Sequence, residues 1–233
     1  MSDYSSHIGA QHFVQRLKAF GLDRPGAKGL VVGFGEGHEA DYLQRNTQTE
    51  IVGIDVLSRI KDRRKTIFRP FLASAMNVPF KATSFDFVFY HHVIEHVPDP
   101  NVTLAEINRV LIPGGILYIG TPNRHRIIGY MGAYQISLRR KIRNNLLDYI
   151  NRLLGRFRNE LGAHAGFSKR EMAGMLAPFF TDLEWLTEEY LIYKYRNRLP
   201  APILKFLQNP SVLEVAAPSI YVLCRKPYVS TRS

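Results

Sequence analysis

Three glycines at alternate positions, Gly33, Gly35 and Gly37, lie where a short apolar run gives way to a helical pattern. Glycine adopts positive backbone torsions and lets a ligand approach the main chain without obstruction by a Cβ atom. The first turn of a helix adds free N–H groups and a partial positive charge, which suit a carboxylate or a phosphate. Asp55 ends the next apolar run, where its carboxylate can accept hydrogen bonds from a ribose diol. The spacing is G-x-G-x-G, so a plain glycine-rich turn is the alternative to a nucleoside site.

Titratable side chains are densest at His91, His92, Glu95 and His96. The letters from His92 to His96 match the H-x-x-E-H string of some zinc proteases. That chemistry needs a helix of several turns, whereas Pro98 leaves room for about one turn, so we predict no metal site. These side chains either complete polar contacts at a corner of the chain or include an imidazole that accepts a proton near neutral pH.

The elements that position these residues alternate along the chain. Helical periodicity covers 8–20, 36–45, 99–111 and 168–176, the last with a capping pattern at Ser168 and Glu171. Near-continuous apolar runs predict strands at 28–33, 50–55, 66–71, 85–90, 114–121, 183–193 and 219–225, with a proline-punctuated excursion at 199–218. Strands that alternate with helices in this way indicate a parallel α/β sheet covered on both faces.

The composition sets the class of protein. The chain has 233 residues, of which 45% are apolar and 22% charged, which predicts one compact domain over residues 1–233. No apolar run approaches the roughly 18 residues of a membrane span, and the first residues lack a secretory pattern. Cys224 is the single cysteine, so an internal disulfide is excluded. We expect a cytoplasmic protein.

The net charge of +11 is concentrated in one stretch, since residues 124–158 hold nine Lys or Arg against Asp148 alone. Within it, the spacing of apolar residues predicts an amphipathic helix between Tyr134 and Phe157, formed by Leu138, Ile142, Leu146, Tyr149, Ile150, Leu153 and Phe157. One interpretation is a lid whose apolar face packs over a ligand site while the arginines are solvated. Another is a helix at the interface of an anionic membrane, and nucleic-acid binding is a third.

Several segments, in this order, give the chain its family resemblance: Gly33–Gly37, Asp55, 75–80 (AMNVPF), 84–88 (SFDFV), 92–100 (HVIEHVPDP), 109–115 (RVLIPGG) and 121–123 (TPN). Over residues 28–123 and the two closing strands, the chain resembles class I S-adenosylmethionine-dependent methyltransferases of the type 11 kind. The resemblance implies a Rossmann-like, doubly wound sheet of seven strands, mainly parallel with the last strand antiparallel. Residues 124–165 would then be an inserted basic helical lid, or a membrane or substrate element.

The resemblance implies S-adenosylmethionine as the cofactor and assigns a role to each matching position. The main chain of the glycine turn would hold the methionyl part, and Asp55 the ribose. Val56 would pack on the adenine. The full set of implied cofactor residues is Gly33, Phe34, Gly35, Gly37, Asp55, Val56, Ser74, Ala75, Met76, Tyr90 and His91. Members of the family often carry acids at the positions of Val31 and Ser74, so a non-catalytic binding or regulatory module of this fold is an alternative.

For the reaction, the resemblance implies methyl transfer, and the candidates for a catalytic imidazole are His92, His96 and His164. The basic stretch follows Thr121-Pro122-Asn123, similar to the place of a membrane-associating insertion in quinone-biosynthesis O-methyltransferases. We therefore expect O-methylation of a small or amphiphilic acceptor, lipid-like or glycan, with peripheral association with an anionic membrane as an option. The [DN]-P-P-[FY] motif of base-methylating enzymes is replaced by residues 90–93 (YHHV), which makes nucleic acid a less favoured partner and an RNA methyltransferase a secondary alternative.

Overall fold

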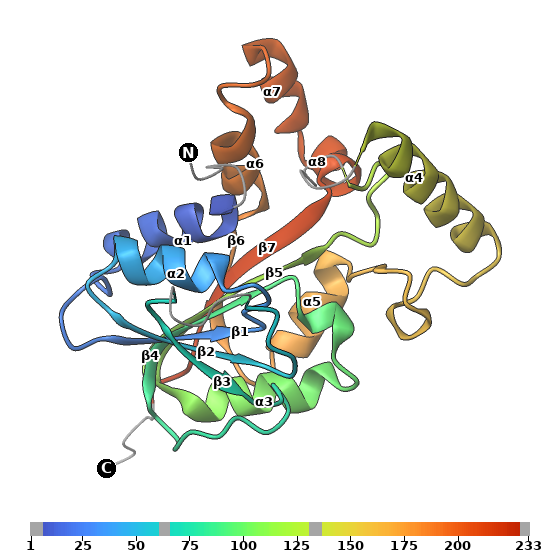
Figure 1. The fold of residues 1–233 in the computed structure, drawn as a ribbon. Coiled ribbons are helices and arrows are strands. Elements are labelled where there is room, and N and C mark those ends of the chain that lie inside the picture. The colour runs from blue at the N-terminus through green and yellow to red at the C-terminus, as the bar shows by residue number, and fades with distance from the viewer. Residues whose placement is uncertain (1–6, 61–65, 131–136, 229–233) are drawn as a thin grey trace.

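A computed structural model describes residues 7–60, 66–130 and 137–228. Its centre is a seven-stranded sheet in the order β3-β2-β1-β4-β5-β7-β6, in which β1 to β5 are parallel and β7 runs antiparallel between β5 and β6 (Figure 1). The strands are β1 Lys28–Val32, β2 Glu50–Asp55, β3 Arg69–Leu72, β4 Phe85–His91, β5 Leu111–Pro122, β6 Thr181–Trp185 and β7 Ser219–Arg225. This arrangement confirms the predicted doubly wound α/β sheet with an antiparallel last strand.

Helices cover both faces of the sheet, because side chains along each strand point alternately to opposite sides. Val31 and Phe89 pack with α1 (Ile8–Ala19), α2 (His38–Asn46) and α6 (Thr187–Tyr195). Val32 and Tyr90, one position along each strand, pack on the other face with α3 (Pro100–Val110) and α5 (Lys169–Leu176). The central strands β1, β2, β4, β5 and β7 are apolar on both sides for this reason, as the sequence indicated.

The strand order reverses between β1 and β4, since β2 and β3 extend to one side of β1 and β5 to the other side of β4. In doubly wound sheets, ligands bind beyond the carboxyl ends of the strands at such a reversal. The glycine turn (Gly33–Gly37) follows β1, Asp55 ends β2, and the histidine segment (residues 91–96) covers the end of β4 and the turn after it, so these candidate residues converge on this one edge.

One predicted strand is wrong in part. Residues 183–193 are divided between the end of β6 and the helix α6. The aromatic and β-branched residues of this run favour a strand by propensity, but packing overrides propensity here. As a helix, the segment buries Tyr190 and Leu191, and acids at Glu188 and Glu189 lie in the first turn, where the helix dipole favours them.

The proline-rich excursion at 199–218 is also more regular than predicted. It forms two short helices, α7 (Ala201–Leu207) and α8 (Pro210–Ala216), each with proline in its first turn. Proline is tolerated there because the first N–H groups of a helix have no intrahelical partner.

The basic stretch forms the helix α4 (Leu138–Leu153), capped by the Ser137 hydroxyl. It ends before Phe157, where the predicted helix ended, and residues 134–136 of the predicted helix lie outside the described residues. Figure 1 shows α4 apart from the sheet, at the same end of the molecule as α7 and α8. Within the described ranges, no helix combines the length and the apolar character needed to cross a membrane.

Candidate functional site

The glycine turn between β1 and α2 has three residues in the left-handed region, with φ of +76° at Gly33, +55° at Gly35 and +89° at Gly37. A Cβ atom on Gly33 would lie 2.3 Å from Cγ2 of Val93, which belongs to the histidine segment after β4. A side chain is therefore disfavoured at these three positions by torsion and, at Gly33, also by space. The main chain of the turn lies at the carboxyl edge of the sheet, directly against the histidine segment.

Asp55 faces this turn. Its Oδ2 accepts a hydrogen bond from the Gly35 N–H at 2.8 Å, and its Oδ1 accepts one from the Leu57 N–H at 3.0 Å. The carboxylate is held by main-chain donors on two sides, so its position is fixed before any ligand arrives. Val56, the next residue, leaves 65% of its surface exposed and offers an apolar face beside the carboxylate.

The remaining cofactor candidates differ in what they present. The Ser74 hydroxyl accepts the Met76 N–H at 3.1 Å, which orders the turn after β3. Phe34 is buried against Phe68, with 5.6 Å between the ring centroids, and Ala75 is buried in the core, so both can contact a ligand only through the main chain. The expected lining by the Tyr90 side chain is not found, because strand alternation turns that ring into the core beneath α3.

A cavity of about 410 Å³ opens beside the histidine segment. It brings together four imidazoles, from the segment after β4 and from the loop before α5: His91, His92, His96 and His164. The rings of His96 and His164, far apart in the chain, lie 4.7 Å from each other, and those of His91 and His92 lie 4.4 Å apart. The three candidates for a catalytic imidazole thus share one cavity.

Glu95 is the buried anion of this cavity. Its Oε2 accepts a hydrogen bond from the Thr121 hydroxyl at 3.1 Å, and its Oε1 lies 3.5 Å from Nδ1 of His92 and 4.0 Å from Nε2 of His96. Burial alone would raise the pKa of Glu95, but the hydrogen bond and charge of His92 outweigh it and the pKa is lowered. Glu95 is therefore ionised at neutral pH and orients the two imidazoles.

His92 is suited to accept a proton. Its enclosure in the cavity and the neighbouring His91 lower its pKa below the usual 6.5, although Glu95 opposes the shift. His92 is consequently neutral at pH 7. Its φ of +55° is uncommon for a residue with a side chain, and such torsions cluster at functional sites. His164 shows the same combination, with a φ of +45° and a pKa lowered mainly by burial and by His96.

The structure adds residues that the sequence analysis missed. Glu39 in the first turn of α2 lies 2.9 Å from Nδ1 of His91 and lines the cavity. Gly9 of α1 permits this contact, because a Cβ there would lie 2.6 Å from the His91 ring. Lys194 of α6 also lines the cavity, and burial lowers its pKa to about 8. The only feature of the sequence that could have indicated a role for Glu39 is its position two residues after the glycine turn.

Residues 92–96 carry the H-x-x-E-H string of some zinc proteases. The H-x-x-E-H string forms only the short 3₁₀ turn at Ile94–His96, as expected from its position between β4 and Pro98. Over the ranges that the structure describes, no group of three or more His, Cys, Asp or Glu side chains is arranged to hold a metal ion.

The fold and the edge site place a glycine turn and a fixed carboxylate, features typical of nucleoside-binding α/β proteins, beside a cavity lined by imidazoles. The family model for a methyltransferase domain matches residues 30–119, which include the glycine turn, Asp55 and the histidine segment. Together with the strand order 3-2-1-4-5-7-6, this match shows that the chain has the fold of the class I S-adenosylmethionine-dependent methyltransferases.

Two curated relatives and one solved structure illustrate this likeness. The chain is 29% identical to phosphoethanolamine N-methyltransferase 2 of Caenorhabditis elegans over 44% of this chain and 25% of that protein. It is 25% identical to the ubiquinone biosynthesis O-methyltransferase of Psychrobacter arcticus over 78% and 73% of the respective chains. The Haemonchus contortus phosphoethanolamine N-methyltransferase 2 in complex with S-adenosyl-L-methionine has the same fold, with a TM-score of 0.56, 18% identity, and coverage of 96% of this chain and 57% of that one. Several relatives are longer than the matched region, which covers 25% to 56% of their length.

The close approach of Gly33 to Val93 gives a first prediction. Gly33→Ala combines an unfavourable positive φ with a Cβ that overlaps Val93, so we expect the free energy of unfolding to fall by about 2–4 kcal/mol. Gly35→Ala is the matched control, because its φ is also positive but no atom lies within 4 Å of the added Cβ. Denaturant unfolding should show a loss of about 1 kcal/mol for the control. Equal losses for both variants would contradict the packing of the turn against Val93.

Proposed function

We propose that the protein transfers a methyl group from S-adenosylmethionine to a hydroxyl group of a small or amphiphilic acceptor. The observation that carries this proposal is the contact between Gly33 and Val93, which makes the glycine turn and the histidine cavity neighbours. A cofactor held at the turn and an acceptor held in the cavity would meet at this contact. Transfer between them needs in-line alignment and exclusion of water.

The residues at the turn fit the cofactor. Asp55 presents a fixed carboxylate for the two ribose hydroxyls, and exposed Val56 provides an apolar surface for the adenine ring. The N-terminus of α2, directly after Gly37, suits the methionyl carboxylate. When bound, S-adenosylmethionine supplies a methyl group made electrophilic by its sulfonium.

The cavity provides the acceptor side. Neutral His92 accepts the proton that an acceptor hydroxyl loses as its oxygen attacks the methyl carbon, and Glu95 stabilises the resulting imidazolium. A hydroxyl must lose its proton as it is methylated, whereas a neutral amine attacks without a base, so an imidazole base in the cavity suits oxygen as the methylated atom. Arg126, Tyr130 and His164 line the cavity. We therefore assign to residues 124–165 the role of enclosing the acceptor.

A non-catalytic binding module is the competing function, on account of Val31 and Ser74. Neither residue has a carboxylate to offer a cofactor. Val31 is also buried in the core, and the Ser74 hydroxyl accepts a hydrogen bond from the Met76 N–H. Isothermal titration with S-adenosylmethionine and S-adenosylhomocysteine tests binding, and we expect heat and a thermal shift with both. If neither S-adenosylmethionine nor S-adenosylhomocysteine gives heat or a thermal shift, the proposed function is contradicted.

Catalysis is tested separately from binding. The protein is incubated with S-adenosylmethionine labelled in its methyl group and with a small-molecule and lipid extract. We expect the label to enter an extractable compound with wild-type protein and not with His92→Gln. Binding of cofactor without transfer of label would identify the non-catalytic module instead.

A further inference from the structure

The helix α4 is amphipathic in the reverse sense to a helix that packs on a protein core. The side chains of α4 that are least exposed are polar and recur at helical spacing: Lys141, Asn144, Asn145, Asp148, Asn151 and Arg152. Asp148 is the one fully buried residue among them. The apolar positions are on the outside, so the expectation that this apolar face packs over the ligand site is wrong.

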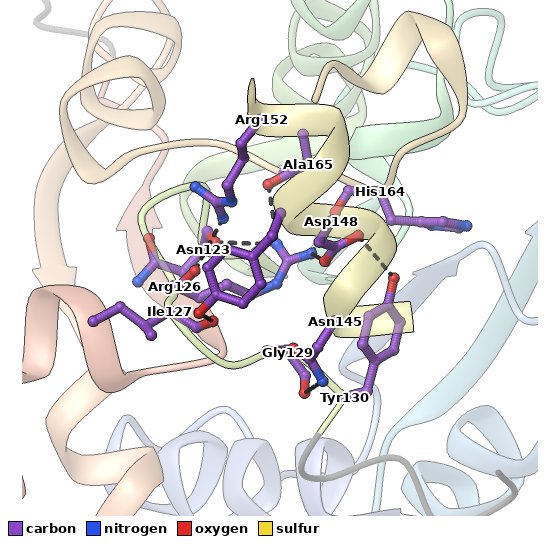
Figure 2. Close-up of polar contacts among 12 residues, drawn as sticks. Asn123, Arg126, Ile127, Gly129, Tyr130, Asn145, Asp148, Arg152, His164 and Ala165 are labelled. Carbon is purple, nitrogen blue, oxygen red and sulfur yellow. Dashed lines mark hydrogen bonds and ion pairs between the residues drawn. The ribbon is translucent and has the colours of Figure 1, made fainter. Parts of the chain in front are cut away.

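Polar contacts hold the helix in this orientation (Figure 2). The Arg126 guanidinium, itself buried, donates to Asp148 at 3.0 Å and to the carbonyls of His164 and Ala165, both at 3.2 Å. Asn145 accepts the Gly129 N–H at 2.7 Å. Turning α4 over would leave the buried Arg126 without its partner Asp148. An unpaired buried charge costs several kcal/mol, so the present orientation is favoured.

More contacts lie around the same anchor. Arg152 donates to the Arg126 carbonyl at 2.9 Å, and the Tyr149 hydroxyl donates to the Ile127 carbonyl at 2.6 Å. Phe157, the one buried member of the predicted apolar series, lies beneath the guanidinium groups of Arg126 and Arg152. Hydrogen bonds and cation–π contacts thus hold one side of α4 against the rest of the protein, and the opposite side faces outward.

The outward side carries a continuous aliphatic stripe. Leu138, Ile142, Leu146 and Leu153 recur on one face of the helix and leave 72%, 61%, 59% and 87% of their surfaces exposed. At 100° per residue, the exposed Ile150 and Leu154 lie beyond Leu146 around the helix, outside the stripe and beside the arginines. Contiguous apolar patches are uncommon on proteins that remain in water and mark sites of interaction.

The charge beside the stripe identifies its partner. Arg139, Arg140 and Arg143 are exposed and, at 100° per residue, lie along the edge of the stripe away from the body. A second copy of this helix would bring like charges together, and a nucleic acid would leave the aliphatic side chains in water. Anionic lipid meets both requirements, since the stripe enters the acyl boundary while arginines contact headgroups.

We propose that α4 lies flat in the interface of an anionic lipid bilayer, with the Arg126–Asp148 anchor holding its apolar stripe toward the lipid. Arg126 and His164 belong both to this anchor and to the wall of the histidine cavity. Docking therefore sets the cavity beside the membrane surface. As a consequence that rests on the proposed function, the acceptor is an amphiphile drawn from the bilayer.

Co-sedimentation with vesicles of phosphatidylglycerol and phosphatidylcholine, and of phosphatidylcholine alone, tests the docking. We expect wild-type protein to sediment with the anionic vesicles only. Leu146→Ser/Leu153→Ser and Arg139→Glu/Arg140→Glu/Arg143→Glu should each lower the partition coefficient at least about tenfold. The matched control, Lys18→Glu/Arg45→Glu/Lys81→Glu, reverses three exposed charges on α1, α2 and the segment before β4 and should change it less than threefold.

Three outcomes would overturn the proposal: no sedimentation of wild-type protein, an equal loss in the control, or insensitivity to the leucine substitutions. Insensitivity to leucine together with salt-dependent RNA binding would assign the basic helix to nucleic acid. A wild-type dimer that the leucine substitutions convert to monomer, without vesicle binding, would assign the stripe to a second copy. Isothermal titration with S-adenosylhomocysteine on each variant distinguishes loss of docking from failure of the proposed cofactor site, which α4 does not form.

Discussion

Asp55→Asn is expected to weaken binding of S-adenosylmethionine about 100-fold while leaving the fold intact. The carboxylate is held toward the glycine turn by the N–H groups of Gly35 and Leu57. Hydrogen bonds to an ionised group contribute about 1.5–3 kcal/mol each, and about 1.4 kcal/mol corresponds to a tenfold change in affinity. Asparagine keeps the size and one acceptor oxygen of Asp55 but loses the charge that two ribose hydroxyls would share.

Isothermal titration of wild-type and variant protein measures this effect. Asp182→Asn is the control, because it makes the same chemical change at an exposed carboxylate of β6 and should leave the dissociation constant unaltered. The thermal midpoint of Asp182→Asn should remain near that of the wild type, and that of Asp55→Asn should fall by a few degrees, because the amide replaces one of the two main-chain hydrogen bonds with a donor that faces an N–H group. An unchanged affinity in Asp55→Asn would show that the cofactor does not rest on this carboxylate.

His92→Gln is expected to lower kcat by about 10²–10⁴-fold, the usual contribution of a general base, with cofactor affinity unchanged. In the wild type, activity is present where His92 is neutral and falls as acid protonates it. Because its pKa is lowered from 6.5, the acid limb of the kcat profile lies below pH 6.5. Glutamine does not titrate, so the residual activity of the variant should lack this limb.

The control for His92→Gln is His125→Gln, a histidine outside the cavity that lies 3.2 Å from the Glu214 carboxylate. It should retain both kcat and the acid limb. Retention of the limb in His92→Gln would contradict the role of His92, and loss of the limb in His164→Gln instead would move the role to that residue. The labelled-methyl assay with the extract described above provides the rate.

The cofactor side of the site was predictable because it depends on local chemistry and on one rule of topology. Alternating glycines after a strand permit the positive torsions of a tight turn wherever that strand lies in the fold. Neighbouring parallel strands bring their carboxyl ends to one edge, so Asp55 was bound to lie near the turn once β1 and β2 pair. The cap of α5 by Ser168 and Glu171 is local in the same way, and it is present.

The acceptor side was less predictable because it is assembled from distant segments. His96 and His164 meet only after α5 and its preceding loop fold onto the sheet, and no spacing in the sequence reports that contact. Lys194 and Tyr190 were hidden because their segment has the propensity of a strand, whereas burial against α1 makes it the helix α6. Gly9 gave no signal, since its role is the space it leaves for His91.

The orientation of α4 shows a different limit. Its sequence predicts an amphipathic helix but not which side faces the protein. The buried pair of Arg126 and Asp148 determines that side, and Arg126 lies outside the helix. The usual assumption that apolar residues face inward therefore gives the wrong orientation.

The most direct test of the central claim is a crystal structure of the protein with S-adenosylhomocysteine. We predict that the ribose hydroxyls lie within hydrogen-bonding distance of the Asp55 carboxylate, that the adenine packs on Val56, and that the sulfur points toward His92. A nucleoside bound elsewhere, or an Asp55 side chain turned away from a ligand that occupies the glycine turn, would contradict the account.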